Sequence, residues 1–274
     1  DAGRGFSTPI LYTPPEGAPQ ALVAGSHQLT AYDVETGKPV WWFTGLTWQL
    51  KPTPVMDGNR LYILGWAGGS DLGNQEELPE WREVLRLRDA NGDGKLQLQE
   101  AGEARLERDW KEIDLDRDGV LGERDWKMYR AKRRAVNSIT AIRLGGRGDM
   151  TAESFLWRYT KSLPNAPSPL VYQGVVYLLK EGGILTALNG ETGEVFKQGR
   201  LTGALDQYFA SPVAAGGKLY AVSQAGHLVV LRAGADWEIL AVNELDDECY
   251  ATPALADGRV YVRTRSALYA FAAK

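Results

Sequence analysis

A short motif recurs five times along this chain and constrains its fold more than any other feature. In each copy a serine or threonine stands directly before a proline, and an apolar pair, a turn and a strand-like run follow. The copies are Ser7-Thr8-Pro9, Pro52-Thr53-Pro54, Pro167-Ser168-Pro169, Ala210-Ser211-Pro212 and Ala251-Thr252-Pro253. Self-similarity at a fixed period indicates an array of supersecondary units that bury their apolar faces against one another.

Each copy contains further strand-like runs. A second run ends in alanine and an apolar residue, as in Leu29–Tyr32, Ile139–Ile142, Leu185–Leu188 and Leu268–Phe271. Two copies then reach a Glu-Thr-Gly turn and a last run, Glu35–Trp41 and Glu191–Phe196. Alternating apolar residues with Gly-containing turns between them are typical of antiparallel strands. The repeat therefore predicts an all-β propeller of four-stranded blades.

The spacing of the marker prolines predicts an insertion. From Pro9 to Pro54 is about 45 residues, and the last two intervals are about 43 and 41 residues, which suits propeller blades. The interval from Pro54 to Pro169 is about 115 residues, and removing about 70 restores the period. We therefore expect propeller blades at 1–66, an inserted lobe at 67–136 and further blades at 137–274.

Two Asp- and Gly-rich segments stand in tandem inside the insertion, Asp89–Glu100 and Asp114–Asp125. Both place oxygen side chains at positions 1, 3, 5 and 12, and glycine at position 6. Calcium takes about six to eight oxygen ligands, and this spacing wraps a chain around it, with the carbonyl of position 7 as a further ligand. The expected ligand residues are Asp89, Asn91, Asp93, Lys95, Gln97 and Glu100 in the first loop, and Asp114, Asp116, Asp118, Val120 and Asp125 in the second.

Helix-compatible runs flank both loops, so the segment resembles an EF-hand pair. The resemblance implies that the apolar residues at position 8, Leu96 and Leu121, bridge the loops. The second loop has Asp125 where the pattern has glutamate, and the aspartate side chain is one methylene shorter. We therefore expect tighter calcium binding in the first loop, where Glu100 can place both oxygens on the ion. The alternative is a surface turn rich in Asp and Gly.

The run Ala-x-Asp-x-x-Thr-Gly-x-x-x-Trp from Ala31 to Trp41 gives the propeller a resemblance. It is similar to the repeats of quinoprotein alcohol dehydrogenases and of the propeller lipoprotein in the bacterial outer-membrane assembly machine. In that family the Trp and the preceding Gly dock one blade on the next; Gly37 and Trp41 match, and Gly193 keeps only the glycine. The resemblance also implies seven or eight blades. The five visible unit starts are therefore either the C-terminal part of a longer propeller or a compact five-bladed closure.

Composition excludes some classes of partner. Hydrophobic and charged fractions of 44% and 24% are those of an ordinary soluble protein. A net charge of −4 gives no general attraction to nucleic acid or to an anionic membrane. No apolar run reaches the ~20 residues of a membrane-spanning helix. The chain opens at Asp1 without an initiator Met, which suggests a processed or truncated product.

Two functions remain open. Quinoprotein dehydrogenases resemble one another in an adjacent-cysteine disulfide over the cofactor, and this chain has one cysteine, Cys249. We therefore expect calcium as the cofactor and no pyrroloquinoline quinone (PQQ). The favoured function is a calcium-binding, non-enzymatic scaffold for a protein or glycan partner, with calcium ordering the lobe; the alternative is a PQQ-dependent dehydrogenase or a fragment of one. The basic run 127–134 is either an interaction surface or a solvated helix face. Millimolar calcium and the family's usual address favour the periplasm, the cell surface or secretion.

Overall fold

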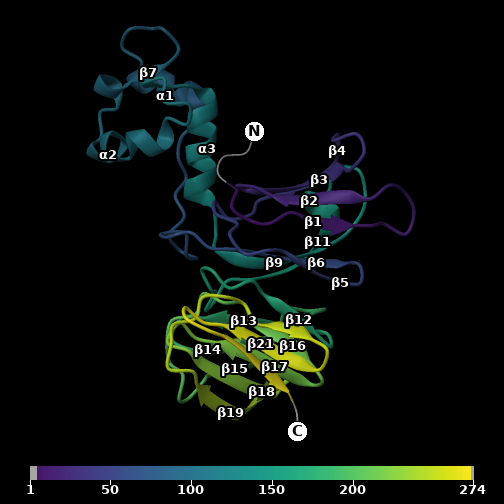
Figure 1. The fold of residues 1–274 in the computed structure, drawn as a ribbon. Coiled ribbons are helices and arrows are strands. Elements are labelled where there is room, and N and C mark those ends of the chain that lie inside the picture. Colours follow the sequence, from purple (N-terminus) through teal and green to yellow (C-terminus); the bar gives the residue numbers. More distant parts are fainter. Residues whose placement is uncertain (1–4, 273–274) are drawn as a thin grey trace.

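The repeats fold into five successive antiparallel β-sheets, from which a helical lobe stands apart (Figure 1). The computed structural model describes residues 5–272, so the chain start at Asp1 lies outside it. Blade 1 contains β1 (Ile10–Tyr12), β2 (Gln20–Ala24), β3 (Gln28–Asp33), β4 (Pro39–Thr44) and β10 (Gly148–Asp149). Blade 2 has the order β11-β9-β6-β5, from β5 (Val55–Asp57), β6 (Arg60–Gly65), β9 (Ser138–Arg143) and β11 (Phe155–Tyr159).

The remaining blades follow the chain without interruption. Blade 3 contains β12 (Leu170–Tyr172), β13 (Val175–Lys180), β14 (Ile184–Asn189) and β15 (Val195–Arg200). Blade 4 contains β16 (Val213–Ala215), β17 (Lys218–Val222), β18 (His227–Arg232) and β19 (Glu238–Glu244). Blade 5 contains β20 (Ala254–Ala256), β21 (Arg259–Arg263) and β22 (Leu268–Ala272) among the described residues. The predicted all-β architecture is thus confirmed, with four-stranded units in blades 2, 3 and 4.

Local turn chemistry explains the hairpins within each blade. The turns Gln173-Gly174, Gly216-Gly217 and Asp257-Gly258 have positive φ at both residues, as a two-residue type I′ turn requires. The Asp33 turn is stabilised by its side chain, whose Oδ1 accepts hydrogen bonds from the Thr36 N–H at 2.7 Å and hydroxyl at 2.8 Å. Gly37 closes that turn with φ +67° and donates its N–H to the Asp33 carbonyl.

The marker hydroxyls connect neighbouring blades. The N–H of Thr53 donates to Ser168 Oγ at 3.0 Å, and the N–H of Ser168 donates to Ser211 Oγ at 2.9 Å. The N–H of Ser211 then donates to Thr252 Oγ1 at 3.0 Å. At the other end, Ser7 Oγ donates to the Pro52 carbonyl at 3.0 Å. These hydrogen bonds form a ladder along the blades, which explains the serine or threonine before the marker proline in blades 3, 4 and 5.

Apolar side chains fill the spaces between consecutive blades. Separate core clusters join blades 1 and 2, blades 2 and 3, blades 3 and 4, and blades 4 and 5. Trp41 is fully buried and donates its indole N–H to Gln20 Oε1 at 2.8 Å. Trp157 of blade 2 packs on the turn of blade 3 so closely that a Cβ on Gly193 would lie 2.6 Å from its ring. The docking tryptophan for Gly193 therefore comes from the preceding blade.

Blade 2 reaches its last strand by a detour that the repeat pattern does not predict. After β9, the short strand β10 pairs in parallel with β4 of blade 1, with Gly148 opposite Trp41. The short helix α4 (Thr151–Ser154) then leads into β11. Thr151 Oγ1 accepts a hydrogen bond from the Thr44 N–H at 3.0 Å. Blade 1 thereby gains a fifth strand from a segment about 100 residues later in the sequence.

The helical lobe lies between β6 and β9, which pair directly, with Gly65 opposite Ser138. Its elements are α1 (Trp81–Arg88), β7 (Leu96–Gln97), η1 (Leu98–Glu100), α2 (Ala104–Ile113), β8 (Val120–Leu121) and α3 (Glu123–Arg134). The lobe has an apolar core of its own, which includes Trp81, Trp110 and Trp126. None of the helices in residues 5–272 is long and apolar enough to cross a membrane.

A buried asparagine ties together the two chain segments that connect the lobe to blade 2. Asn137 is 1% exposed. Its Oδ1 accepts from the Ala67 N–H at 2.7 Å, and its Nδ2 donates to the Ala67 carbonyl at 2.9 Å. Thr47 of the loop after β4 donates its hydroxyl to the Val136 carbonyl at 2.8 Å. The base of the lobe is thus fixed to both blade 1 and blade 2.

We predict that Ser168→Ala lowers the free energy of unfolding by about 1–2 kcal/mol, because it leaves the half-buried Thr53 N–H without its acceptor. Urea unfolding followed by tryptophan fluorescence measures the change. Ser168→Thr is the matched control, since threonine occupies the same place at Thr53 and Thr252 and keeps the hydroxyl. Equal destabilisation by both substitutions would contradict the hydrogen-bond ladder.

A second prediction concerns the independence of the propeller. Replacing residues 66–137 by Asn-Gly should leave the five sheets folded, because β6 and β9 then form a two-residue hairpin and the lobe's apolar core is separate from those of the propeller. The replacement removes Trp66, which packs against the core between blades 2 and 3, so the melting temperature should fall. The replacement also removes Asn137, which would otherwise lose its buried partners. Far-ultraviolet circular dichroism should lose its helical signal and keep a cooperative thermal transition. An unfolded or insoluble product would show that the propeller needs the lobe.

Candidate metal centre

Each of the two Asp-rich loops begins at the end of a helix. Asp89 is the C-terminal cap of α1 and Asp114 that of α2; each donates its N–H to a carbonyl four residues earlier, at 3.0 and 2.9 Å. The two loops meet through β7 and β8, in which Leu96 pairs with Leu121, and both side chains are fully buried. The predicted contact between the position-8 residues is thus present.

In the first loop, side-chain oxygens turn inward onto the loop's own amides. Asp89 accepts the N–H of Gly92 at 2.7 Å and that of Gly94 at 3.0 Å. Asp93 Oδ1 accepts the Lys95 N–H at 2.9 Å, and Asp93 Oδ2 accepts the Gln97 amide at 2.7 Å. The hydrogen bond from the Lys95 N–H, with smaller contributions from Gln97 and Asn91, lowers the pKa of Asp93. The loop is therefore folded into a turn whose hydrogen bonds stabilise the ionised form of the exposed Asp93 carboxylate.

The two position-12 carboxylates make the same contacts in spite of their different lengths. Glu100 Oε1 accepts the N–H of Ala90, at position 2, and its Oε2 accepts the N–H of Gln97, at position 9, at 2.8 and 3.0 Å. Asp125 accepts the corresponding amides of Leu115 and Gly122, at 3.1 and 2.9 Å. The shorter Asp125 therefore still reaches across the second loop and closes it.

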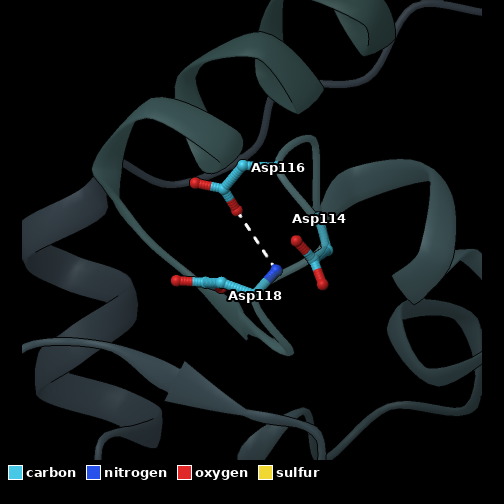
Figure 2. Close-up of side chains that lie close together, drawn as sticks. All are labelled: Asp114, Asp116 and Asp118. Carbon is cyan, nitrogen blue, oxygen red and sulfur yellow. Dashed lines mark hydrogen bonds between the residues drawn. The ribbon is translucent and has the colours of Figure 1, made fainter.

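The second loop gathers three carboxylates. Ligand oxygens of Asp114, Asp116 and Asp118 all lie within 4.8 Å of one another, and Figure 2 shows these side chains around the interior of the loop. Asp116 Oδ1 accepts the Asp118 N–H at 3.4 Å, and Asp118 Oδ1 accepts the Val120 N–H at 3.0 Å. Asp116 keeps its other oxygen for a further partner, whereas Asp118 Oδ2 faces the Lys95 ammonium.

Asp114 differs from the other two because it is buried. Its side chain is 7% exposed; Oδ2 accepts the Gly119 N–H at 3.0 Å, and Oδ1 has no partner among the described residues. A buried carboxylate oxygen without a donor or cation is costly, because it loses its water without compensation. A cation held by oxygen ligands would remove that cost. The donor set of the second loop, all carboxylate oxygen, suits a hard divalent ion.

The remaining expected ligands lie on the strands that join the loops. Val120 pairs with Gln97 across β7 and β8, and Lys95 directly precedes β7. The Lys95 ammonium lies 3.8 Å from Asp118 Oδ2, so a residue of the first loop faces a carboxylate of the second. That the carbonyls of Lys95 and Val120 bind metal remains a prediction.

The basic run 127–134 serves the lobe itself. Arg130 donates to Glu80, Arg133 to Glu76, and Arg134 to Glu77. Hydrogen bonds from Arg105 and then from Arg133 lower the pKa of Glu76. These contacts clasp α3 to the segment before α1. The sequence analysis did not predict these ion pairs. The only signal for them in the sequence is the group of glutamates at 76–80, which could pair with a basic helix.

Comparisons with known proteins place the whole chain in one family. The family described as outer membrane protein assembly factor BamB matches residues 5–274. The crystal structure of BamB from Moraxella catarrhalis is similar, with a TM-score of 0.52 and 14% sequence identity over 98% of this chain and 60% of that chain. This chain therefore spans about 60% of that protein's length, and the likeness is one of fold. No curated protein matches the sequence. By its family match, the chain belongs to the outer membrane protein assembly factor BamB family.

Proposed function

We propose that this protein is a calcium-binding, non-enzymatic β-propeller that acts as a scaffold for a protein or glycan partner. In this proposal residues 67–136 are an EF-hand pair inserted between blades 1–66 and 137–274. The observation that carries it is the buried, partnerless oxygen of Asp114 beside the carboxylates of Asp116 and Asp118. Clustered carboxylates repel one another, and a divalent cation neutralises them.

The first loop supports the same chemistry with a different donor set. Asp89, Asn91, Asp93 and Gln97 supply side-chain oxygens, and Glu100 spans the loop from position 2 to position 9. Exchange of these internal hydrogen bonds for metal contacts would let Glu100 bind an ion through both oxygens. Asp125 is shorter, so we propose that the first loop binds calcium more tightly than the second.

Calcium would order the lobe through the contacts between its two loops. Leu96 and Leu121 lie in the lobe's apolar core together with the helix residues Val84 and Ile113. A loop that tightens on an ion moves its position-8 residue, and that residue packs against both loops and their helices. Metal binding and folding of the lobe are therefore coupled.

The scaffold part of the proposal rests on the family and the fold. The family's description names a factor in outer membrane protein assembly, and repeat propellers present long loops on one face of the array. We propose a location in the periplasm, at the cell surface or outside the cell, where calcium reaches millimolar levels. A fold alone does not determine a protein's function. We therefore propose the partner only as a protein or a glycan.

We predict that Glu100→Gln weakens calcium binding by at least about tenfold, and that Asp125→Asn weakens it less, because only the longer carboxylate can be fully bidentate. Isothermal titration calorimetry of the metal-free protein gives both affinities. Glu107→Gln, an exposed change on α2 outside the loops, is the control and should bind like the wild type. A larger loss for Asp125→Asn would reverse the ranking, and a wild-type protein that binds no calcium would refute the proposal.

The alternative, a quinone-dependent dehydrogenase, predicts a different result. Such catalysis needs a base at the substrate carbon and a cofactor held by its carboxylates and ring. We expect neither stoichiometric binding of PQQ in gel filtration with calcium nor dye reduction with simple alcohols and sugars. A quinoprotein dehydrogenase of known activity, run in the same assays, is the positive control. Stoichiometric binding with turnover would replace the scaffold by the enzyme.

A further inference from the structure

A cleft of about 510 Å³ separates the second loop from the propeller. Its size falls within the range of about 300–1,000 Å³ that is typical of ligand sites. The propeller contributes Trp48, from the loop after β4, and Gly68, which follows β6. The lobe contributes side chains from α2, the second loop and α3. The cleft thus lies where the inserted lobe and blades 1 and 2 meet.

The cleft has the opposite charge to the whole protein. Four cationic side chains line it, against two carboxylates, Glu112 and Asp114, whereas the chain carries a net charge of −4. The cationic residues are Lys111, Arg117, Arg124 and Lys132. Within residues 5–272, Lys111 and Arg117 form no ion pair. A cationic cleft on an anionic protein concentrates anions locally.

One carboxylate already occupies part of this surface. Glu112 accepts a hydrogen bond from the Lys132 ammonium at 2.7 Å, and that ammonium lies 5.5 Å from the centroid of the Trp48 ring. The Glu112 side chain is 70% exposed, so an incoming carboxylate can replace it on Lys132. The Trp48 ring packs against the His27 ring, and the two ring centroids lie 5.2 Å apart. The cleft therefore combines a firm aromatic wall with exchangeable carboxylate contacts.

From this arrangement we infer that the cleft binds an acidic segment of a partner polypeptide. Arginine presents a fork of donors that matches carboxylates, and lysine adds a point charge. The aromatic wall suits the apolar part of a Glu side chain. A few extended residues fill the volume of the cleft, with their carboxylates directed to Lys111 and Arg117 and their backbone along Trp48.

Calcium in the second loop strengthens this binding, a step that rests on the proposed function. Asp114 belongs both to the loop and to the cleft wall. Its negative charge repels an acidic peptide, and a divalent cation beside it removes that repulsion. Because such coupling is reciprocal, the peptide should raise calcium affinity by the same factor. The lobe would then present its peptide site when calcium is bound.

The test measures binding of fluorescein-labelled hexaglutamate to the full chain by fluorescence anisotropy in low salt. Each titration is run twice, once in about 1 mM calcium to saturate the loops and once in EGTA to remove calcium from them. The double variant Lys111→Glu/Arg117→Glu should bind about tenfold more weakly than the wild type, because two contacts become repulsive. The control Lys218→Glu/Arg259→Glu makes the same change in net charge at exposed sites outside the cleft. It should change the affinity by less than about twofold. Lys111→Gln/Arg117→Gln should give an intermediate loss, and circular dichroism checks that each variant is folded.

Two results overturn the inference that the cleft binds an acidic peptide, and a third overturns its coupling to calcium. Equal weakening by both charge reversals would show attraction by net charge rather than by the cleft. Displacement of the peptide by inorganic phosphate or polygalacturonate at equal charge concentration would assign the cleft to another class of anion. Binding that is the same in calcium and in EGTA, while calorimetry shows that calcium binds, would remove the coupling and leave the proposed function standing. Absence of calcium binding in calorimetry refutes the proposed function itself.

Discussion

The hydrogen bonds between marker residues of neighbouring blades are the interaction on which the propeller depends. A proline cannot donate a hydrogen bond, so the residue before it carries the last free N–H ahead of each inner strand. In blades 2, 3 and 4 that N–H donates to a hydroxyl of the following blade, as the N–H of Thr53 does to Ser168. Apolar packing between blades is not directional. The ladder supplies the direction, because each hydroxyl fixes where its neighbour's inner strand begins.

The lobe is tolerated because it enters and leaves the blade at adjacent residues. Gly65 and Ser138 are paired in neighbouring strands. Within the blade, β6 and β9 therefore form an ordinary hairpin with a long connection. Closing a long loop adds little entropy cost relative to a short one. The lobe also satisfies its own apolar groups, and Asn137 pairs the backbone of Ala67 at the base of the lobe. The insertion therefore adds a structure to blade 2 without changing the sheet.

The sequence reveals periodic and local features better than it reveals burial. The four-stranded units and their turns follow from short-range patterns, as the Asp33 turn shows. The parallel pairing of β10 with β4 does not follow, since Gly148 and Trp41 are distant and two-residue strands carry no pattern. In the candidate site, the loop spacing predicts which residues come together. It could not predict that Asp114 alone would be buried with a free oxygen, because burial depends on how α2 and the cleft wall pack around it.

Helix α3 gives the lobe a rigid connection between its loops and the propeller. It is 12 residues long, so its ends are about 18 Å apart. One end begins beside Gly122 and Asp125 of the second loop, and the other leads directly to Val136, whose carbonyl is bonded to Thr47 of the propeller. Arg130, Arg133 and Arg134 hydrogen-bond the C-terminal half of the helix to the glutamates before α1 and so hold that half in place. If the second loop rotates, the helix would therefore pass that rotation, as a lever does, to the connection between blades 1 and 2.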